Sequence, residues 1–256
     1  MIEKIIVGGC SFTDPNFISI LEPQYNHTVT WTDFLNGEVT NVARSGNGNP
    51  TIINDVLESI YNDKPDRVII SLSDWSRYSI RGHNINPTFL LHQTRSTESE
   101  WLKVNGEVDR QLNLITPSNY KIQDRESFII SSINSNIINS IRDTTLALYN
   151  LALVCEHLRI KLHIFQMIYP FNLPHKYSDI QHKFEDKLLK SKLFMDLFDT
   201  KADLIGFPWI KNAGGFVAQT ILTSEDVVGK IDKHPNARGH EKIGRWFNET
   251  YTNYEI

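Results

Sequence analysis

Apolar and polar residues form two different patterns along the chain, and together these patterns predict an α/β fold. Short apolar runs, typical of buried strands in a parallel sheet, are separated by segments whose apolar residues recur as on one face of a helix. The expected strands cover residues 5–9, 38–43, 67–71 and 161–168. The expected helices cover residues 31–35, 52–60, 133–158 and 180–197, and a last one carries Ile243, Trp246 and Phe247. Strand, loop, helix and strand in this succession indicate parallel βαβ units.

Some stretches break this pattern. We expect an irregular insertion at about 78–130, because this stretch is polar with scattered aromatic residues, and its Asn105-Gly106 is typical of a hairpin turn. Insertions of this length often form lids or specificity elements. Residues 14–30 and 207–215 are expected to be irregular. The sequence contains no repeat or low-complexity tract that divides it, so a single domain over residues 1–256 is predicted.

Composition and charge narrow the class of protein. The chain has 256 residues, 40% of them hydrophobic and 22% charged, which is ordinary for a globular protein with a large core. Its formal net charge of -4 gives no electrostatic reason to expect nucleic acid or an anionic membrane as a partner. Its two cysteines, Cys10 and Cys155, favour a reducing compartment over a disulfide framework, and no apolar run approaches the ~20 residues of a membrane helix. We expect a cytoplasmic protein, or one carried on a particle or released by lysis, of open oligomeric state.

A serine directly after the first expected strand is the first candidate for chemistry. Ligands of open α/β sheets bind at the carboxyl ends of the strands, and Ser11 follows the two glycines that end the first apolar run. Ser11 can act as a nucleophile if a base reaches it, and its N–H can help to hold an oxyanion. The alternative is structural, with Ser11 or Thr13 capping the next helix. Cys10 is a rival nucleophile, but strand alternation turns it away from Ser11, and the Gly-Lys-Ser/Thr ending of a phosphate-binding loop is missing.

Three later segments are expected at the same edge of the sheet as Ser11. They are the Gly46–Asn49 loop, Ser71-Leu72-Ser73-Asp74-Trp75 and Asp232-Lys233-His234-Pro235. Together with Gly9-Cys10-Ser11, they resemble the motifs of the SGNH hydrolase superfamily, also called GDSL-type esterases and lipases. The resemblance implies an α/β fold in which a mostly parallel central sheet forms a three-layer α/β/α sandwich of the SGNH or flavodoxin-like kind.

The resemblance also assigns roles. It implies that Ser11 is the nucleophile, that His234 is its general base, and that Asp232 orients the imidazole and stabilises its charged form. The chemistry needs such a base, because an aliphatic hydroxyl is a poor nucleophile at neutral pH. The resemblance further implies an oxyanion hole made by the N–H groups of Ser11 and Gly46 and by a polar side chain of the third loop.

The sequence departs from the family pattern at three places. Cys10 replaces the aspartate of Gly-Asp-Ser, at a position that is not the nucleophile. Ser73 stands where the family has its oxyanion-hole asparagine, so Ser73, or else Asn47 or Asn49 of the neighbouring loop, is expected to donate instead. Asp232 precedes His234 by two positions rather than three, which leaves open whether this acid or another orients the histidine.

Other polar residues near these motifs have two interpretations. Asp74, Trp75 and Arg77 are candidates for substrate binding, but Asp74 can instead cap a turn and Arg77 can pair with an acid. His240 is interpreted as a structural contact, because a zinc pair with His234 lacks further ligands at a recognisable spacing. We therefore expect no metal and no organic cofactor.

The leading hypothesis is a serine hydrolase that cleaves a small-molecule or glycan ester, for example an O-acetyl group on a carbohydrate. Two alternatives stay open. The altered oxyanion loop and Asp-x-His spacing suit a binding or structural protein that kept the fold, and an acyltransferase would differ only in using a sugar hydroxyl in place of water.

Overall fold

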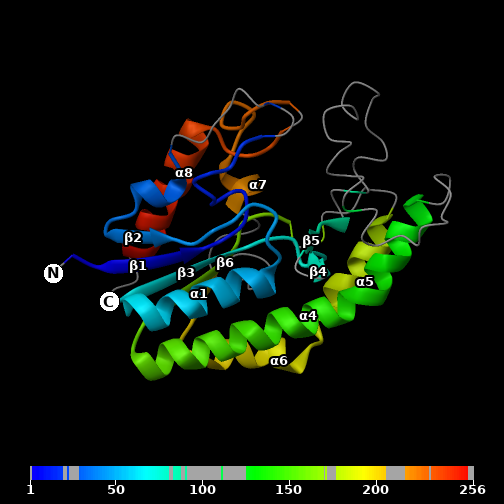
Figure 1. Ribbon diagram of the computed structural model, residues 1–256, viewed down its shortest axis with the longest axis horizontal. Coiled ribbons are helices and arrows are strands. Elements are labelled where there is room, and N and C mark those ends of the chain that lie inside the picture. Colours follow the sequence, from blue (N-terminus) through cyan, green and yellow to red (C-terminus); the bar gives the residue numbers. More distant parts are fainter. Residues whose placement is uncertain are drawn as a thin grey trace.

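The computed structural model describes residues 2–19, 22, 29–80, 83–87, 90, 111, 125–169, 171, 177–205, 217–230 and 232–252. A sheet of five parallel strands, in the order β2-β1-β3-β6-β7, runs through its centre (Figure 1). The strands are β1 (Lys4–Gly8), β2 (Glu38–Asn41), β3 (Arg67–Leu72), β6 (Lys161–Gln166) and β7 (Asp203–Ile205). Strand order reverses between β1 and β3, and in open α/β sheets ligands bind outside the carboxyl ends of the strands at this point.

Helices cover both faces of the sheet, and this confirms the predicted α/β/α layering (Figure 1). One face carries α1 (Asn49–Asp63) and α4 (Arg125–Leu158), with α5 (Ser178–Leu189), α6 (Lys192–Asp196) and η4 (Leu197–Asp199) packed on α4. The other face carries η1 (Trp31–Phe34), α7 (Val217–Ile221) and α8 (Ala237–Thr252). The prediction of a single domain stays a prediction.

Burial explains the local pattern in β1 and α1. Ile5, Ile6 and Val7 are at most 3% exposed, and full burial of such a side chain stabilises the fold by about 1.5–3 kcal/mol. Of the apolar residues of α1 that were expected to face the sheet, Leu57 is partly buried and the other four are buried: Ile52, Ile53, Val56 and Ile60. Pro50 lies in the first turn of α1, where its missing N–H costs nothing.

The longest helix begins earlier than the sequence pattern indicated. α4 starts at Arg125 rather than Ile133, so the irregular insertion expected to reach residue 130 ends before α4. The first turns of α4 contain Ser127, Ser131 and Ser132, and because serine favours caps and turns, they obscure the start of an apolar row at every fourth position. The row is buried, and its members are Ile129, Ile133, Ile137 and Ile141.

Two further elements differ from expectation. The helix predicted over 180–197 is divided into α5 and α6, because Ser191 has the extended backbone of a helix N-cap, with φ -68° and ψ 118°. The edge strand β7 was not predicted, since three residues are too few to show a period. A short hairpin of β4 (Tyr78–Ile80) and β5 (His83–Ile85) opens the insertion, whereas the turn predicted at Asn105-Gly106 and the stretch 207–215 lie outside the described residues.

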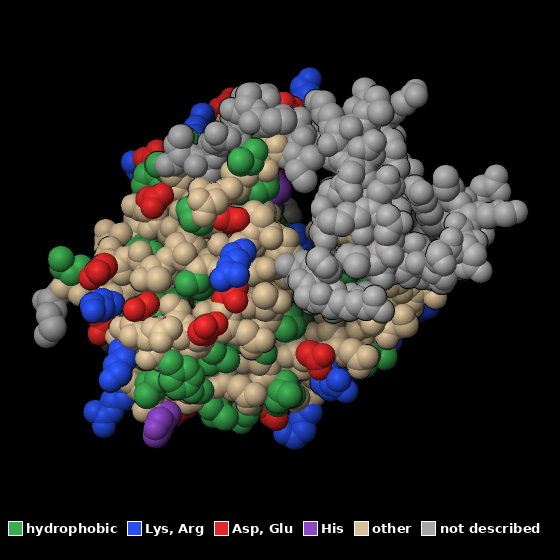
Figure 2. Space-filling view, in the orientation of Figure 1, with side chains coloured by type: hydrophobic (Ala, Val, Ile, Leu, Met, Phe, Trp, Pro, Cys, Tyr) green, Lys and Arg blue, Asp and Glu red, His purple; other side chains and the backbone are tan. Residues whose placement is uncertain are grey.

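The described residues contain no membrane-spanning helix. Each helix in these ranges is too short or too polar to cross a bilayer. On the face shown in Figure 2, the described acidic and basic side chains are interspersed, without a large patch of one sign.

Candidate active site

A tight turn after β1 presents Ser11 at the reversal point of the sheet. The carbonyl oxygen of Cys10 accepts hydrogen bonds from the N–H groups of Thr13 (2.8 Å) and Asp14 (3.0 Å), which closes the turn. Thr13 Oγ1 accepts a bond from Trp31 Nε1 at 3.1 Å and donates to Ser71 Oγ of β3 at 3.2 Å. Cys10 itself is fully buried, as is common for a small cysteine. These contacts fix the position of Ser11 relative to β3.

The structure brings the three residues of the predicted triad together. Ser11 Oγ lies 2.7 Å from His234 Nε2, and His234 Nδ1 lies 2.6 Å from Asp232 Oδ1. The backbone N–H of His234 also donates to Asp232 Oδ1, at 2.9 Å. In the tautomer that carries its proton on Nδ1, the Nδ1–H group donates a hydrogen bond to the carboxylate. The unprotonated Nε2 can then accept a hydrogen bond, and in a reaction the proton, from the Ser11 hydroxyl. The two-residue spacing of Asp232 and His234 thus allows one carboxylate oxygen to bind both the backbone and the ring.

Two aromatic rings hold the imidazole in place. Phe17 stacks on His234 with ring centroids 4.0 Å apart, and Phe12 lies against it at 4.4 Å. The His234 side chain is 22% exposed and that of Asp232 6% exposed. His234 therefore faces solvent in part, while Asp232 is enclosed.

Asp232 has a second hydrogen-bond partner, Ser19, that the sequence did not reveal. Ser19, which is fully buried, donates its hydroxyl proton to Asp232 Oδ2 and accepts a hydrogen bond from the Glu22 N–H at 2.8 Å. Burial raises the pKa of Asp232, but the hydrogen bonds from His234 and Ser19 outweigh this, so the pKa is about 2. Asp232 is thus ionised at neutral pH, as an acid that stabilises an imidazolium needs to be.

Two backbone N–H groups near Ser11 are free to bind an oxyanion. Within the described part of the chain, the N–H groups of Ser11 and Gly46 donate no hydrogen bond. Gly46 has φ +81° in a turn closed by a bond from the Asn47 N–H to the Arg44 carbonyl at 3.3 Å, as in a type II turn. A side chain at Gly46 would meet no atom within 4 Å, so backbone conformation rather than crowding favours glycine there.

Asp14 connects the Ser11 turn to the Gly46 turn. Its carboxylate Oδ2 accepts hydrogen bonds from the Ser45 N–H at 2.7 Å and from the Ser45 hydroxyl at 2.6 Å. Because Ser45 precedes Gly46, this contact holds the two free N–H groups on neighbouring turns. Asp14 is only 7% exposed, so the connection is enclosed.

The third loop offers a hydroxyl where the family has an amide. Asn49 does not point its polar atoms at open space, because its Oδ1 accepts a bond from the Ser73 N–H at 2.8 Å and its Nδ2 donates to the Ser73 carbonyl at 3.4 Å. Ser73 Oγ is buried and has no hydrogen-bond partner among the described residues. Asn49 therefore positions Ser73, and the Ser73 hydroxyl is the donor left over.

The remaining candidates of this loop have different surroundings. Asp74 accepts a bond from the Ser76 N–H at 2.7 Å, in line with a turn cap. Trp75 is fully buried, donates to Gln166 Oε1 at 2.9 Å and packs edge-on against Phe194, so it lies in the core rather than on a substrate-facing surface. Arg77 is only 7% exposed, and its Nη1 donates to the Asn47 carbonyl.

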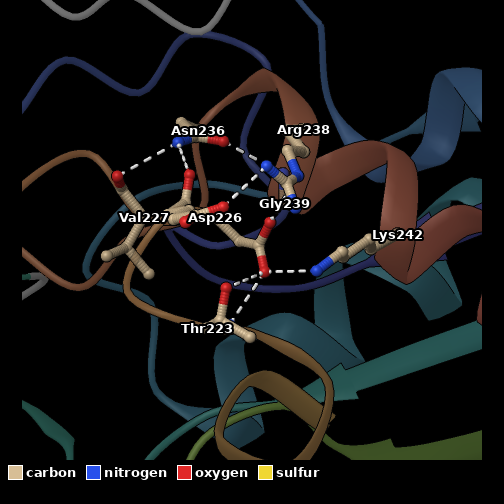
Figure 3. Close-up of polar contacts among 8 residues, drawn as sticks. Thr223, Asp226, Val227, Asn236, Arg238, Gly239 and Lys242 are labelled. Carbon is tan, nitrogen blue, oxygen red and sulfur yellow. Dashed lines mark hydrogen bonds and ion pairs between the residues drawn. The ribbon is translucent and has the colours of Figure 1, made fainter.

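A buried carboxylate anchors the loop that carries Asp232 and His234 (Figure 3). Asp226 has no exposed surface, and Lys242 and Arg238 of α8 lie 2.5 Å and 3.0 Å from its two carboxylate oxygens. Thr223 donates to it from both its N–H and its hydroxyl. Burial raises the pKa of Asp226, but the bonds from Lys242 and Thr223 outweigh this, so the pKa is about 2.

Backbone contacts complete this anchor. The carbonyl of Asp226 accepts a bond from the Asn236 N–H at 2.9 Å, and Asn236 caps α8 by accepting from the Gly239 N–H at 3.1 Å. A Cβ at Gly239 would lie 2.2 Å from the Asp226 carbonyl oxygen, so only glycine allows this approach. His234 is thereby held between a fixed loop and the start of α8.

Replacing Asp226 by asparagine is expected to lower the free energy of unfolding by about 2–4 kcal/mol, because it removes charge-assisted bonds to a buried group. The pKa of Asp226 is about 2 against an ordinary 3.8, so its stabilisation is present above about pH 4 and is lost as the pH falls through 2. Urea unfolding should therefore show a difference between the proteins that shrinks from pH 6 to pH 3. Arg245→Met, which breaks an exposed pair with Glu241, is the control, with a loss below about 1 kcal/mol. Equal losses in both variants would contradict the anchoring role.

His240 lies in the first turn of α8 and is fully buried. The structural interpretation of His240 is confirmed, since its buried Nδ1 accepts a hydrogen bond from the Trp31 N–H at 3.2 Å. Among the described residues, no group of three or more His, Cys, Asp or Glu side chains is arranged to hold a metal ion.

Comparison with known proteins relates the fold to esterases. No family model and no curated protein matches the sequence. The structure is similar to that of the psychrotrophic esterase EstA from Pseudoalteromonas sp., with a TM-score of 0.52 and 11% identity over 98% of each chain. A catalytic mutant of the acetylxylan esterase Axe2 from Geobacillus stearothermophilus gives a TM-score of 0.49 and 14% identity, over 96% of this chain and 93% of that one. The chain has an SGNH hydrolase-type fold.

Proposed function

We propose that the protein is a serine hydrolase that cleaves an ester through an acyl-Ser11 intermediate. The observation that supports this most directly is the row of contacts from Ser11 Oγ to His234 Nε2 (2.7 Å) and from His234 Nδ1 to Asp232 Oδ1 (2.6 Å). EstA, which shares the fold, is an esterase, but fold alone does not fix chemistry. The proposal therefore rests on the row of contacts.

The first half of the reaction forms the acyl-enzyme. Ser11 Oγ attacks the ester carbonyl carbon while its proton passes to His234 Nε2, and the carbonyl oxygen becomes an oxyanion. The free N–H groups of Ser11 and Gly46 are the donors for this oxyanion, with the Ser73 hydroxyl as the third. The intermediate collapses when the C–O bond to the alcohol breaks, and the leaving alkoxide takes the proton from His234.

The second half restores the enzyme. Water loses a proton to His234 and attacks the acyl carbon, and Ser11 leaves with that proton as the acid product is released. Asp232 stabilises the imidazolium in both halves, and it is able to do so because its pKa of about 2 keeps it ionised. A carbohydrate O-acetyl ester fits this chemistry and stays a prediction for the substrate.

The two alternatives make different demands on the site. A binding protein needs no hydrogen-bonded Ser11, His234 and Asp232, so the short contacts favour catalysis. An acyltransferase would use the same acyl-enzyme with a sugar hydroxyl as acceptor, and product analysis with an acyl donor and a glycan separates it from hydrolysis.

A fluorophosphonate probe tests the proposal directly. We expect Ser11 Oγ to displace fluoride and become phosphonylated, and mass spectrometry of the Ser11 peptide should show the adduct. Ser11→Ala should take up no label, whereas Ser178→Ala, which removes a serine at the start of α5, should be labelled like the wild type. A wild-type protein that stays unlabelled would favour a binding protein.

A further inference from the structure

The loop after β3 contains an unusual group of unsatisfied donors. Three buried side-chain atoms within five residues lack a hydrogen-bond partner in the described part of the chain: Ser73 Oγ, Ser76 Oγ and Arg77 Nε. Their residues are 0%, 3% and 7% exposed. Buried polar groups in native proteins are nearly always paired, so donors gathered in this way indicate a partner rich in acceptors.

Arg77 also lacks a counter-charge. Its Nη1 donates to the Asn47 carbonyl at 3.3 Å, and no carboxylate of the described chain lies within ion-pair distance of its guanidinium. Other arginines of the protein do have acidic partners, such as Arg67 with Glu3 at 3.0 Å. An isolated buried charge is unfavourable, so Arg77 has the properties of a residue that binds an anionic ligand.

Arg77 lies beside the Gly46 turn of the proposed active site. Asn47, whose carbonyl Arg77 binds, follows Gly46, and Gly46 carries one of the two free N–H groups. The Gly48 backbone packs on Arg77 as well, since a Cβ there would lie 3.3 Å from the Arg77 Cβ. Arg77 therefore belongs to the same loop cluster as the proposed oxyanion hole.

We propose that Arg77, together with the Ser76 hydroxyl, forms a subsite for an anionic group, such as a carboxylate, on the ester substrate. The proposal rests on the proposed function and names its substrate class. The guanidinium suits this role because its planar fork binds a carboxylate through two parallel hydrogen bonds. The Ser73 hydroxyl is not part of this subsite, because it is the third donor of the proposed oxyanion hole.

Matched pairs of charged and neutral esters test the subsite. The charge lies on the alcohol side in 4-acetoxybenzoate against its methyl ester, and on the acyl side in phenyl hemisuccinate against phenyl methyl succinate. We expect Arg77→Met to lower the charged-to-neutral ratio of kcat/KM by about 10- to 100-fold for one pair, since charge-assisted bonds have this strength. Comparing ratios between proteins cancels the intrinsic reactivity of the esters. The pair that responds identifies the side that carries the charge.

Two further variants make the result specific. Arg142→Met removes an exposed guanidinium paired with Asp143 on α4 and should leave both ratios unchanged. Arg77→Lys keeps the charge but not the fork, so its ratio should lie between those of the wild type and Arg77→Met. Unchanged ratios in Arg77→Met and Arg77→Lys would overturn the subsite, and so would a wild type that shows no preference for either charged ester.

Binding without turnover separates the two proposals. In the Ser11→Ala background, calorimetry should detect 4-acetoxybenzoate or phenyl hemisuccinate binding that weakens about tenfold or more when Arg77→Met is added. Hydrolysis and labelling without any charge preference would leave the proposed function standing and reject the subsite. If the protein bound the anion through Arg77 but Ser11 took up no fluorophosphonate label, the subsite would stand and the proposed function would be rejected.

Discussion

Replacing Ser11 or His234 by alanine is expected to lower kcat/KM for small acetyl esters by about 10⁴- to 10⁶-fold, the size of loss found when a serine triad is broken. Ser11 Oγ and His234 Nε2 are 2.7 Å apart, so we expect the two residues to act as one unit. The double variant should therefore be no slower than either single variant, which is the signature of residues that work together. Steady-state hydrolysis of p-nitrophenyl acetate measures all three losses.

The control for this experiment removes a histidine of no catalytic role. His182 is an exposed residue of α5 whose ring lies beside Glu185, and His182→Ala should keep the wild-type rate. Urea midpoints within experimental error of the wild type would show that the slow variants are folded. Folded Ser11→Ala and His234→Ala proteins with unchanged rates would rule out the acyl-serine mechanism.

The parts of the fold that the sequence could predict have local signals. The apolar run of β1 and the row from Ile52 to Ile60 in α1 are visible within a few residues, because periodicity reports burial of one face. The short edge strand β7 has no such signal. The first turns of α4 were missed because serine favours caps and turns in general, although Ile129, between Ser127 and Ser131, is buried.

The site shows the same division between local and distant signals. Ser11, Asp232 and His234 stand in recognisable motifs, and the structure brings them together. Ser19 contacts Asp232 across 213 positions of sequence, and neither residue type nor spacing could indicate this pairing. Asp14 had a weak signal, since Asp-Pro-Asn is typical of a turn, but its bonds to Ser45 depend on the tertiary arrangement.

The third loop shows how a departure from a motif acquires meaning in the structure. From sequence, Ser73, Asn47 and Asn49 were all candidates to replace the missing asparagine, and in the structure Asn47 Nδ2 donates to Asp55. The bonds of Asn49 to the Ser73 backbone divide the tasks, because the amide fixes the loop and the hydroxyl is left free. A hydroxyl is shorter than an amide side chain, so donation from Ser73 requires the backbone of the third loop to approach the oxyanion closely. Asn49 is the residue that holds it there.

Replacing Asp232 by asparagine is expected to lower kcat by about 10³- to 10⁴-fold. The orientation of the side chain should survive, because both the backbone N–H and Nδ1 of His234 point at the same oxygen of Asp232. What is lost is the negative charge, which is present at all assay pH values because the pKa of Asp232 is about 2. The loss should therefore fall on kcat more than on KM, since the proton transferred from Ser11 to His234 in the reaction creates the charge that Asp232 stabilises.

Ser19→Ala is the matched variant, because it separates the negative charge of Asp232 from the hydrogen bond that Ser19 donates to this carboxylate. It removes the hydrogen bond to the remote oxygen of Asp232 but leaves the charge and the contact with His234, so a loss of about tenfold in kcat is expected from one charge-assisted bond. Without that bond the pKa of Asp232 rises, in the direction of its ordinary 3.8, and the carboxylate stays ionised at neutral pH. The kcat of Ser19→Ala should thus be independent of Asp232 ionisation between pH 6 and pH 8. If Asp232→Asn lost no more activity than Ser19→Ala, the charge of Asp232 would have no role in stabilising the imidazolium, and another acid would have to supply it.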